Sequence, residues 1–118
     1  MSPRAFLYVV FCLSLLGNVY AQTNLGSKDS LLRTLKTLPR DTNRVNTLLR
    51  LDKIAATEQA YDSAVYYGKL ALDLATELKF ERGIATAQID LGVSYWYMGN
   101  YTESLNMNYA ALGIFQRT

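Results

Sequence analysis

The sequence lacks histidine altogether and has one cysteine, Cys12, among its 118 residues. Without histidine it cannot form a Ser-His-Asp or Cys-His nucleophilic site, or hold zinc or haem through imidazole. Phe11 precedes Cys12, where a lipoprotein would have a small residue. No phosphate-binding loop or metal-ligand spacing is present either, so we expect no enzyme activity and no cofactor.

The chain has no large excess of either charge sign, and it has little proline. The chain has 12 Lys and Arg against 10 Asp and Glu, with the signs interspersed along the sequence. Nucleic-acid-binding proteins carry a basic patch or stripe, so the sequence predicts no nucleic-acid partner. Proline occurs only at positions 3 and 39, and no proline interrupts a helix after Pro39.

The first 21 residues have the pattern of a secretory signal peptide. Arg4 supplies the positive start, Ala5–Gly17 is apolar and uncharged, and Val19 and Ala21 are the small residues that a signal peptidase requires. We expect cleavage after Ala21, export to the periplasm or the extracellular space, and no membrane span in the remainder. The alternatives are an uncleaved N-terminal membrane anchor and a buried helix.

Apolar residues recur at helical spacing through the rest of the chain, which predicts an all-α fold. We expect a flexible leader over Gln22–Gly26 and helices over Ser27–Leu38, Asp41–Thr57, Tyr61–Leu78, Ile84–Met98 and Tyr101–Gln116. Ser27 is the expected cap of the first helix, and Asp41 or Thr42 caps the second. Pro39, the residues 58–60, the linker 80–83 and Gly99-Asn100 separate the helices.

Two similar segments lie forty residues apart. Leu51, Tyr61, Ala71 and Leu72 recur as Leu91, Tyr101, Ala111 and Leu112. A fixed period of this length is typical of a solenoid, in which each repeat buries its apolar face against the next.

The second segment resembles a tetratricopeptide repeat (TPR). The matching residues are Leu91-Gly92, Tyr95, Gly99, Tyr101 and Ala111-Leu112, with Ser104 in an alanine position, whereas Gln88 and Asn108 replace aromatic residues. The first segment matches at Leu51, Tyr61, Ala64, Ala71 and Leu72 and departs from the pattern at Asp52, Ala55 and Gly68. The forty-residue period resembles the longer-helix variants of exported bacterial proteins.

The resemblance implies antiparallel helix pairs stacked as a short right-handed TPR-like solenoid. Its parts would be the signal peptide 1–21, a leader and N-terminal helix 22–40, a first repeat 41–80 and a second repeat 81–118. Because residues 115–118 fall where the next linker would begin, we expect the array to continue in a longer protein. In such proteins the repeats precede a histidine kinase or DNA-binding regulator region and bind a protein or peptide.

In TPR proteins the first helix of each repeat lines a concave groove. The corresponding positions here are Asn46, Leu49, Lys53, Ala56, Thr57, Thr86, Ile89, Val93, Trp96 and Tyr97. Trp96 and Tyr97 are the expected anchors, because aromatic residues dominate binding hot spots. Alternatively, Trp96 packs on a further repeat or on Met107. Lys53 is either a carboxylate-binding cation or a solvated side chain.

Three further expectations concern residues outside the groove. Stacking would bring Asp52 and Asp90 near each other, without a partner base for acid–base chemistry. Leu105, Leu112, Ile114 and Phe115 would lack a covering layer, which predicts self-association. The alternative to ligand binding is a structural spacer or dimerisation module with no ligand in its groove.

Overall fold

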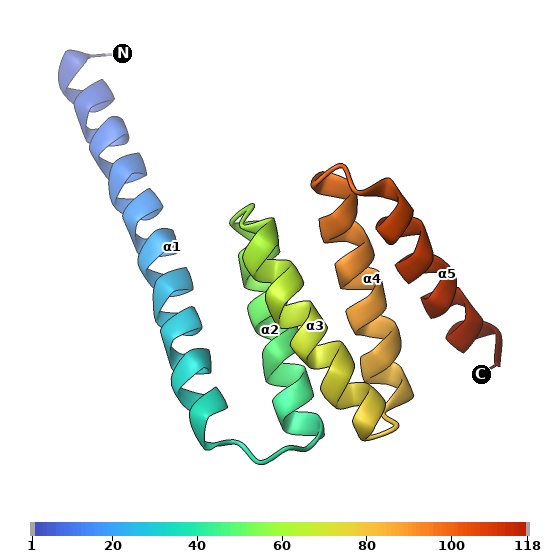
Figure 1. Cartoon of the computed structure of the whole chain (residues 1–118). Coiled ribbons are helices and arrows are strands. Elements are labelled where there is room, and N and C mark those ends of the chain that lie inside the picture. Colours follow the sequence, from blue (N-terminus) through green and yellow to red (C-terminus); the bar gives the residue numbers. More distant parts are fainter. Residues whose placement is uncertain (1, 118) are drawn as a thin grey trace.

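The computed structural model describes the backbone of residues 2–117 and the side chains of residues 2–13 and 28–117. This part of the chain is all-helical, which confirms the predicted fold class. Its helices are α1 (Pro3–Thr37), α2 (Thr42–Thr57), α3 (Tyr61–Glu77), α4 (Glu81–Tyr97) and α5 (Tyr101–Arg117). Each packs against the next in the chain, and α2 also contacts α4 (Figure 1).

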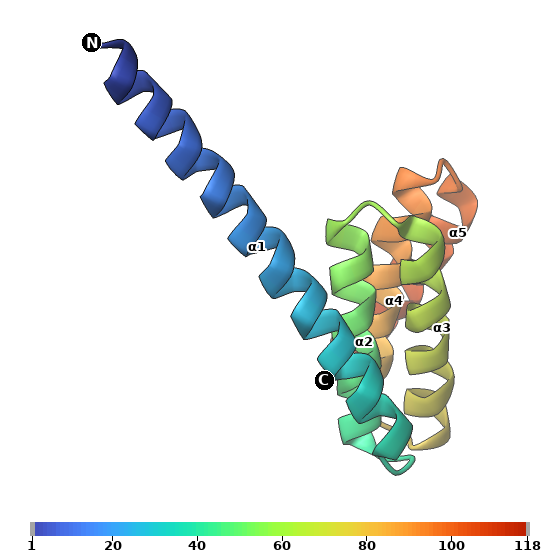
Figure 2. The same ribbon diagram turned by 90° about the vertical axis from the view of Figure 1, so that its left-hand side faces the viewer.

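Helix α1 is longer than the sequence predicts. It continues through residues 22–27, where we expected a leader and a cap at Ser27. No proline lies between Pro3 and Pro39, so each of the intervening residues keeps its backbone donor. The C-terminal part of α1 meets the other helices, with Leu31 buried and Leu35 packed against the core, and the ribbon of the preceding part leads away from them (Figure 2).

The side chains at the expected signal-peptidase site, Val19–Ala21, lie outside the described residues. No helix in the described part of the chain combines the length and the apolarity needed to cross a membrane.

The start of α2 follows the sequence prediction. Asp41 accepts hydrogen bonds from the backbone N–H groups of Asn43 (3.0 Å) and Arg44 (3.2 Å), which satisfies donors that a helix start leaves free. Arg44 in turn donates from Nη1 to the carbonyls of Leu35 (2.9 Å) and Leu38 (2.8 Å) at the end of α1. These bonds hold α1 against α2.

The turns that follow α2, α3 and α4 have the same geometry and recur every twenty residues. Gln59, Lys79 and Gly99 have φ values of 61°, 54° and 79°. The next residue donates its N–H to the carbonyl five positions back, in the pairs Ala60–Ala55, Phe80–Ala75 and Asn100–Tyr95, at 2.8–2.9 Å. This is the Schellman ending of a helix.

The regular turns correct the predicted linker over residues 80–83. The chain reverses at Lys79 and Phe80, so Glu81, Arg82 and Gly83 already belong to α4. Glu81 lies in the first turn, where an acidic side chain interacts favourably with the helix dipole. Arg82 therefore lies in the first turn of α4.

Lys79→Gly is expected to raise the free energy of unfolding by about 1 kcal/mol. A side chain costs roughly this much in the left-handed region, whereas glycine adopts it freely. The reciprocal change, Gly99→Ala, should destabilise by a similar amount through backbone strain alone, because no atom lies within 4 Å of the added Cβ. Urea unfolding of both variants measures the difference. A Lys79→Gly protein that is less stable than the parent would contradict the turn geometry.

The core lies between α2, α3 and α4. Its buried residues are Val45, Leu48, Leu49, Ala71, Leu74, Ala75 and Ala87, with Leu35, Tyr67, Leu72, Phe80 and Ile84 packed against them. Buried leucine and alanine at helical spacing give each helix an apolar face directed at its neighbours. A hollow lined by Leu49 and Phe80, described below, borders this core.

Two glycines mark where neighbouring helices approach each other closely. A Cβ on Gly68 would lie 2.9 Å from Cδ2 of Leu91, so the buried Leu91 of α4 sits directly over Gly68 of α3. A Cβ on Gly92 would lie 2.6 Å from Oδ1 of Asn108 on α5. Ser104 strengthens this second contact by donating a 2.7 Å hydrogen bond to the carbonyl of Gly92. The small residues at positions 68 and 92 therefore allow the neighbouring helices to pack closely.

The outer surface of α5 is partly as expected. Leu105, Leu112 and Phe115 are 54%, 48% and 56% exposed. Ile114, which we expected to be uncovered, is only 8% exposed. It lies three positions from the buried Ala111, on the face that packs against α4.

Candidate binding groove

A hollow of about 410 Å³ lies between the N-terminal halves of α2 and α4. Its lining residues are Asn46, Leu49, Phe80, Arg82, Gly83 and Thr86. Three of the predicted groove residues, Asn46, Leu49 and Thr86, therefore lie together. Gly83 contributes by having no side chain, since a Cβ there would meet Val45 at 3.1 Å and Phe80 at 2.5 Å.

Arg82 is the charged lining residue of this hollow that the sequence analysis missed. Its side chain is exposed and forms no ion pair with any described residue, whereas its neighbour Glu81 lies 3.6 Å from Arg117. The sequence analysis expected a linker over residues 80–83. A residue in a linker has no helix face, so Arg82 was not assigned to the groove. Because α4 begins at Glu81, Arg82 and Thr86 belong to the same helix. They are four positions apart and therefore lie on the same helix face.

The hollow combines polar groups at its rim with an apolar floor. Asn46 is exposed at the rim, and the amide of its side chain can both donate and accept hydrogen bonds. Thr86 donates its hydroxyl to the carbonyl of Arg82 at 2.8 Å and keeps its lone pairs for a donor. Leu49, only 8% exposed, and Phe80 belong to or pack against the core and form the floor.

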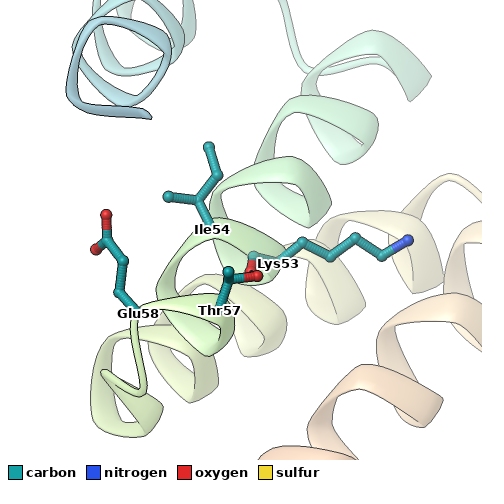
Figure 3. Close-up of a pocket in the computed structure, with 4 residues that line it drawn as sticks. All are labelled: Lys53, Ile54, Thr57 and Glu58. Atoms are coloured by element: carbon teal, nitrogen blue, oxygen red, sulfur yellow. The ribbon is translucent and has the colours of Figure 1, made fainter. Parts of the chain in front are cut away.

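Farther along α2, Lys53 and Thr57 line a second hollow, of about 150 Å³, with Ile54 and Glu58. Figure 3 shows the Lys53 side chain extended and directed away from Glu58. Glu58 pairs with Lys28 of α1 at 3.5 Å. Lys53 is thus available on the side of α2 away from the Lys28–Glu58 pair.

Asp52 and Asp90 form a carboxyl pair beside Lys53. Asp52 is 1% exposed, and burial, followed by the charge of Asp90, raises its pKa to about 7, against the opposing effect of Lys53. Burial likewise raises the pKa of Asp90, and Lys53 lowers it. The effect of Asp90 on Asp52 agrees with the expectation that stacking brings the two together.

Neither carboxyl of this pair is fully satisfied by hydrogen bonds. The Oδ2 atoms of Asp52 and Asp90 have no hydrogen-bond partner among the described residues. A buried carboxylate without partners is costly, which is why the neutral, protonated form of Asp52 persists to about pH 7. The described residues contain no group of three or more side chains suited to a metal ion.

The aromatic residues of α4 lie at the opposite end of the helix from Arg82. Tyr97 stacks on Tyr61 with ring centres 5.1 Å apart and planes at 5°. Trp96 meets Tyr101 edge-on at 4.8 Å. Trp96 and Tyr97 remain 58% and 64% exposed, so both rings keep free surface.

Trp96 faces α5 rather than the hollow between α2 and α4. A third hollow, of about 260 Å³, is lined by Gly92, Val93, Trp96, Tyr97, Ser104 and Asn108. The predicted groove is therefore divided into three hollows, and Ile89, 38% exposed, borders none of them. Helical rotation accounts for the direction of Trp96: it comes ten residues after Thr86, which turns its side chain by about 80° around α4.

Comparisons of the chain with protein-family models, with curated proteins and with solved structures find no match.

Proposed function

We propose that this protein is a binding module that holds a peptide or a protein segment across α2 and α4. The observation that carries the proposal is the 410 Å³ hollow, where the amide of Asn46 and the cation Arg82, which forms no ion pair with a described residue, stand over an apolar floor. A guanidinium binds a carboxylate through two parallel hydrogen bonds. The ligand is therefore an acidic segment with an apolar side chain next to its carboxylate.

The same module is proposed to be TPR-like, with its helix pairs stacked as a short right-handed solenoid. The twenty-residue recurrence of the turns, the contact of α2 with α4, and the packing of Leu91 on Gly68 support this arrangement. We further propose that the protein is exported after cleavage behind Ala21 and is the sensory N-terminal part of a larger bacterial signalling protein. The competing proposal is a spacer or dimerisation module without a groove ligand.

The length of α4 sets the size of the ligand. From Arg82 to Tyr97 the helix rises about 22 Å at 1.5 Å per residue. An extended peptide covers this distance with about seven residues. Its acidic end would lie at Arg82, its middle would pass Lys53, and its other end would reach the exposed face of Tyr97.

Selection of random displayed peptides on the purified chain is expected to enrich sequences that combine an acidic and an apolar residue. For a synthetic peptide of the enriched sequence, Arg82→Ala should weaken binding about 10- to 100-fold, because a hydrogen bond to a charged group contributes about 1.5–3 kcal/mol. Fluorescence anisotropy gives the dissociation constants. Lys69→Ala, which removes an exposed cation from α3, is the matched control and should leave affinity unchanged.

Two results would argue against this proposal. Failure to enrich any sequence favours the spacer. Equal losses of affinity for Arg82→Ala and Lys69→Ala would mean that only the overall charge attracts the peptide and that the hollow has no specific role.

A further inference from the structure

An exposed stripe runs along the whole of α5. Tyr101, Leu105, Asn108, Leu112 and Phe115 follow one another at intervals of four, three, four and three residues, which places them on one face. The four apolar members are 48–56% exposed, and Asn108 at the centre is exposed as well. Among the described helices α5 packs only against α4.

The equivalent stripe on α3 shows what such a surface receives in this fold. Forty residues earlier, the corresponding positions are Tyr61, Val65, Gly68, Leu72 and Ala75, all of them buried or half-buried. Helix α4 packs over this stripe, with Leu91 over Gly68 at its centre. The stripe on α5 is therefore a helix-packing surface.

The central residue determines which helix fits. The position of Gly68 is taken by Asn108, and its side chain fills the space above Gly92. A leucine placed over Asn108 as Leu91 is placed over Gly68 would meet a side-chain amide instead of a glycine without a side chain. An amide covered by another helix needs a hydrogen-bond partner, so the incoming helix must offer a polar group opposite Asn108.

The α5 stripe itself meets this requirement, because it is symmetric about Asn108 to within one residue. Tyr101 and Phe115 lie seven residues before and after Asn108, and Leu105 and Leu112 lie three before and four after it. We propose that two copies of the chain pair through α5, antiparallel, about a twofold axis at Asn108. Each Asn108 then meets its equivalent, and Leu105 of each copy faces Leu112 of the other, as in any isologous interface.

The charges on α5 agree with this pairing. No charged residue occupies the stripe: Glu103 lies off it, and Arg117 pairs with Glu81 of α4. Pairing therefore desolvates no isolated charge, which would be costly. The interface also leaves Arg82 and Asn46 uncovered, so it is independent of the proposed peptide site.

Sedimentation of the full chain over a range of concentrations tests the pairing. The parent is expected to form dimers, and Leu105→Glu to weaken them at least tenfold by placing a charge in the apolar contact. Asn106→Glu adds the same charge on the opposite face of α5 and should leave the dimer intact. A monomer at all concentrations overturns the proposal. So does a dimer that resists Leu105→Glu, or one that dissociates only with Leu7→Glu, which would place the contact on α1.

Disulfide cross-linking tests the orientation, since Cys12 is the single native cysteine. In a Cys12→Ser background, the double variant Leu105→Cys/Leu112→Cys should oxidise to a dimer linked from 105 of one copy to 112 of the other, as mapped by mass spectrometry. The single variant Leu105→Cys should give little dimer. Efficient linkage of 105 to 105 would show parallel pairing and overturn the twofold arrangement.

Asn108→Asp tests the centre of the interface with a change of one atom. Opposed carboxylates repel each other, so the dimer should dissociate at least tenfold more readily at pH 8 than the parent. Circular dichroism of each variant checks that helix content is kept. An Asn108→Asp dimer as tight as the parent at pH 8 would overturn the placement of Asn108 on the axis.

Discussion

Leu91→Ala is expected to lower the free energy of unfolding by about 2–5 kcal/mol, which is a large part of the roughly 5–15 kcal/mol that stabilises a typical domain. Leu91 is 1% exposed and lies over Gly68, where its Cδ2 is the nearest apolar atom. Because Gly68 has no side chain, position 68 offers no atom that could move into the space left by the leucine. The loss should therefore lie near the upper end of the range.

Urea unfolding followed by circular dichroism measures the effect. Leu70→Ala is the matched control: Leu70 of α3 is 38% exposed, and its truncation should cost less than about 1 kcal/mol. Equal, small effects of the two substitutions would show that α4 does not pack on α3 through Leu91. The helix-pair register, and with it the position of Arg82, would then be wrong.

Asp52→Asn is expected to stabilise the protein at pH 8 and to remove most of the pH dependence of its stability between pH 5 and pH 8. The pKa of Asp52 is raised from 3.8 to about 7 in the folded chain. The folded state therefore binds a proton more tightly than the unfolded state. The resulting stabilisation is fully present below pH 3.8 and is lost as the pH rises through about 7.

The size of this effect follows from the two pKa values. Between pH 5 and pH 8 the parent should lose about 3 kcal/mol through Asp52. Burial also raises the pKa of Asp90, so the contribution of Asp90 to stability has the same sign. Asparagine keeps the shape and carries no charge to desolvate. Asp73→Asn, at an exposed position of α3, should leave the pH dependence unchanged. If Asp52→Asn and the parent lose stability in parallel, Asp52 is ionised in the folded chain throughout.

The helices were predictable from the sequence because the apolar residues recur at helical spacing and the residues that end or begin a helix stand between these segments. Pro39, Asp41 and Gly99 gave correct ends, since each has a local physical effect on the backbone. The start of α4 was not predictable in the same way. Lys79 adopts positive φ without being glycine, and no residue type at that position signals the turn.

The candidate site was predictable only in part. The TPR resemblance implied that Asn46, Leu49 and Thr86 share a groove, and all three line the hollow between α2 and α4. The direction of Trp96 depends on the accumulated rotation of α4 and on its edge-on contact with Tyr101. Such a contact between residues of successive helices does not follow from the spacing within either one.

The buried carboxyl pair shows a further limit of sequence reasoning. In the alignment that the TPR resemblance implies, Asp52 stands in the glycine position, and the sequence alone does not say whether its carboxyl is paired, solvated or buried. Burial of Asp52 is possible because Gly68 leaves room: Oδ2 would lie 2.9 Å from a Cβ there. A residue distant in the sequence thus determines the protonation state of Asp52.

The most direct test of peptide binding between α2 and α4 is an amide chemical-shift map. The ¹⁵N-labelled chain is titrated with the acidic peptide obtained by selection, and the shift changes are followed residue by residue. We predict the largest changes at Asn46, Arg82 and Thr86, which line the 410 Å³ hollow, with smaller changes toward Lys53 and Tyr97. Changes concentrated along α5, or spread evenly over the exposed lysines and arginines, would contradict the assignment of the hollow as the binding site.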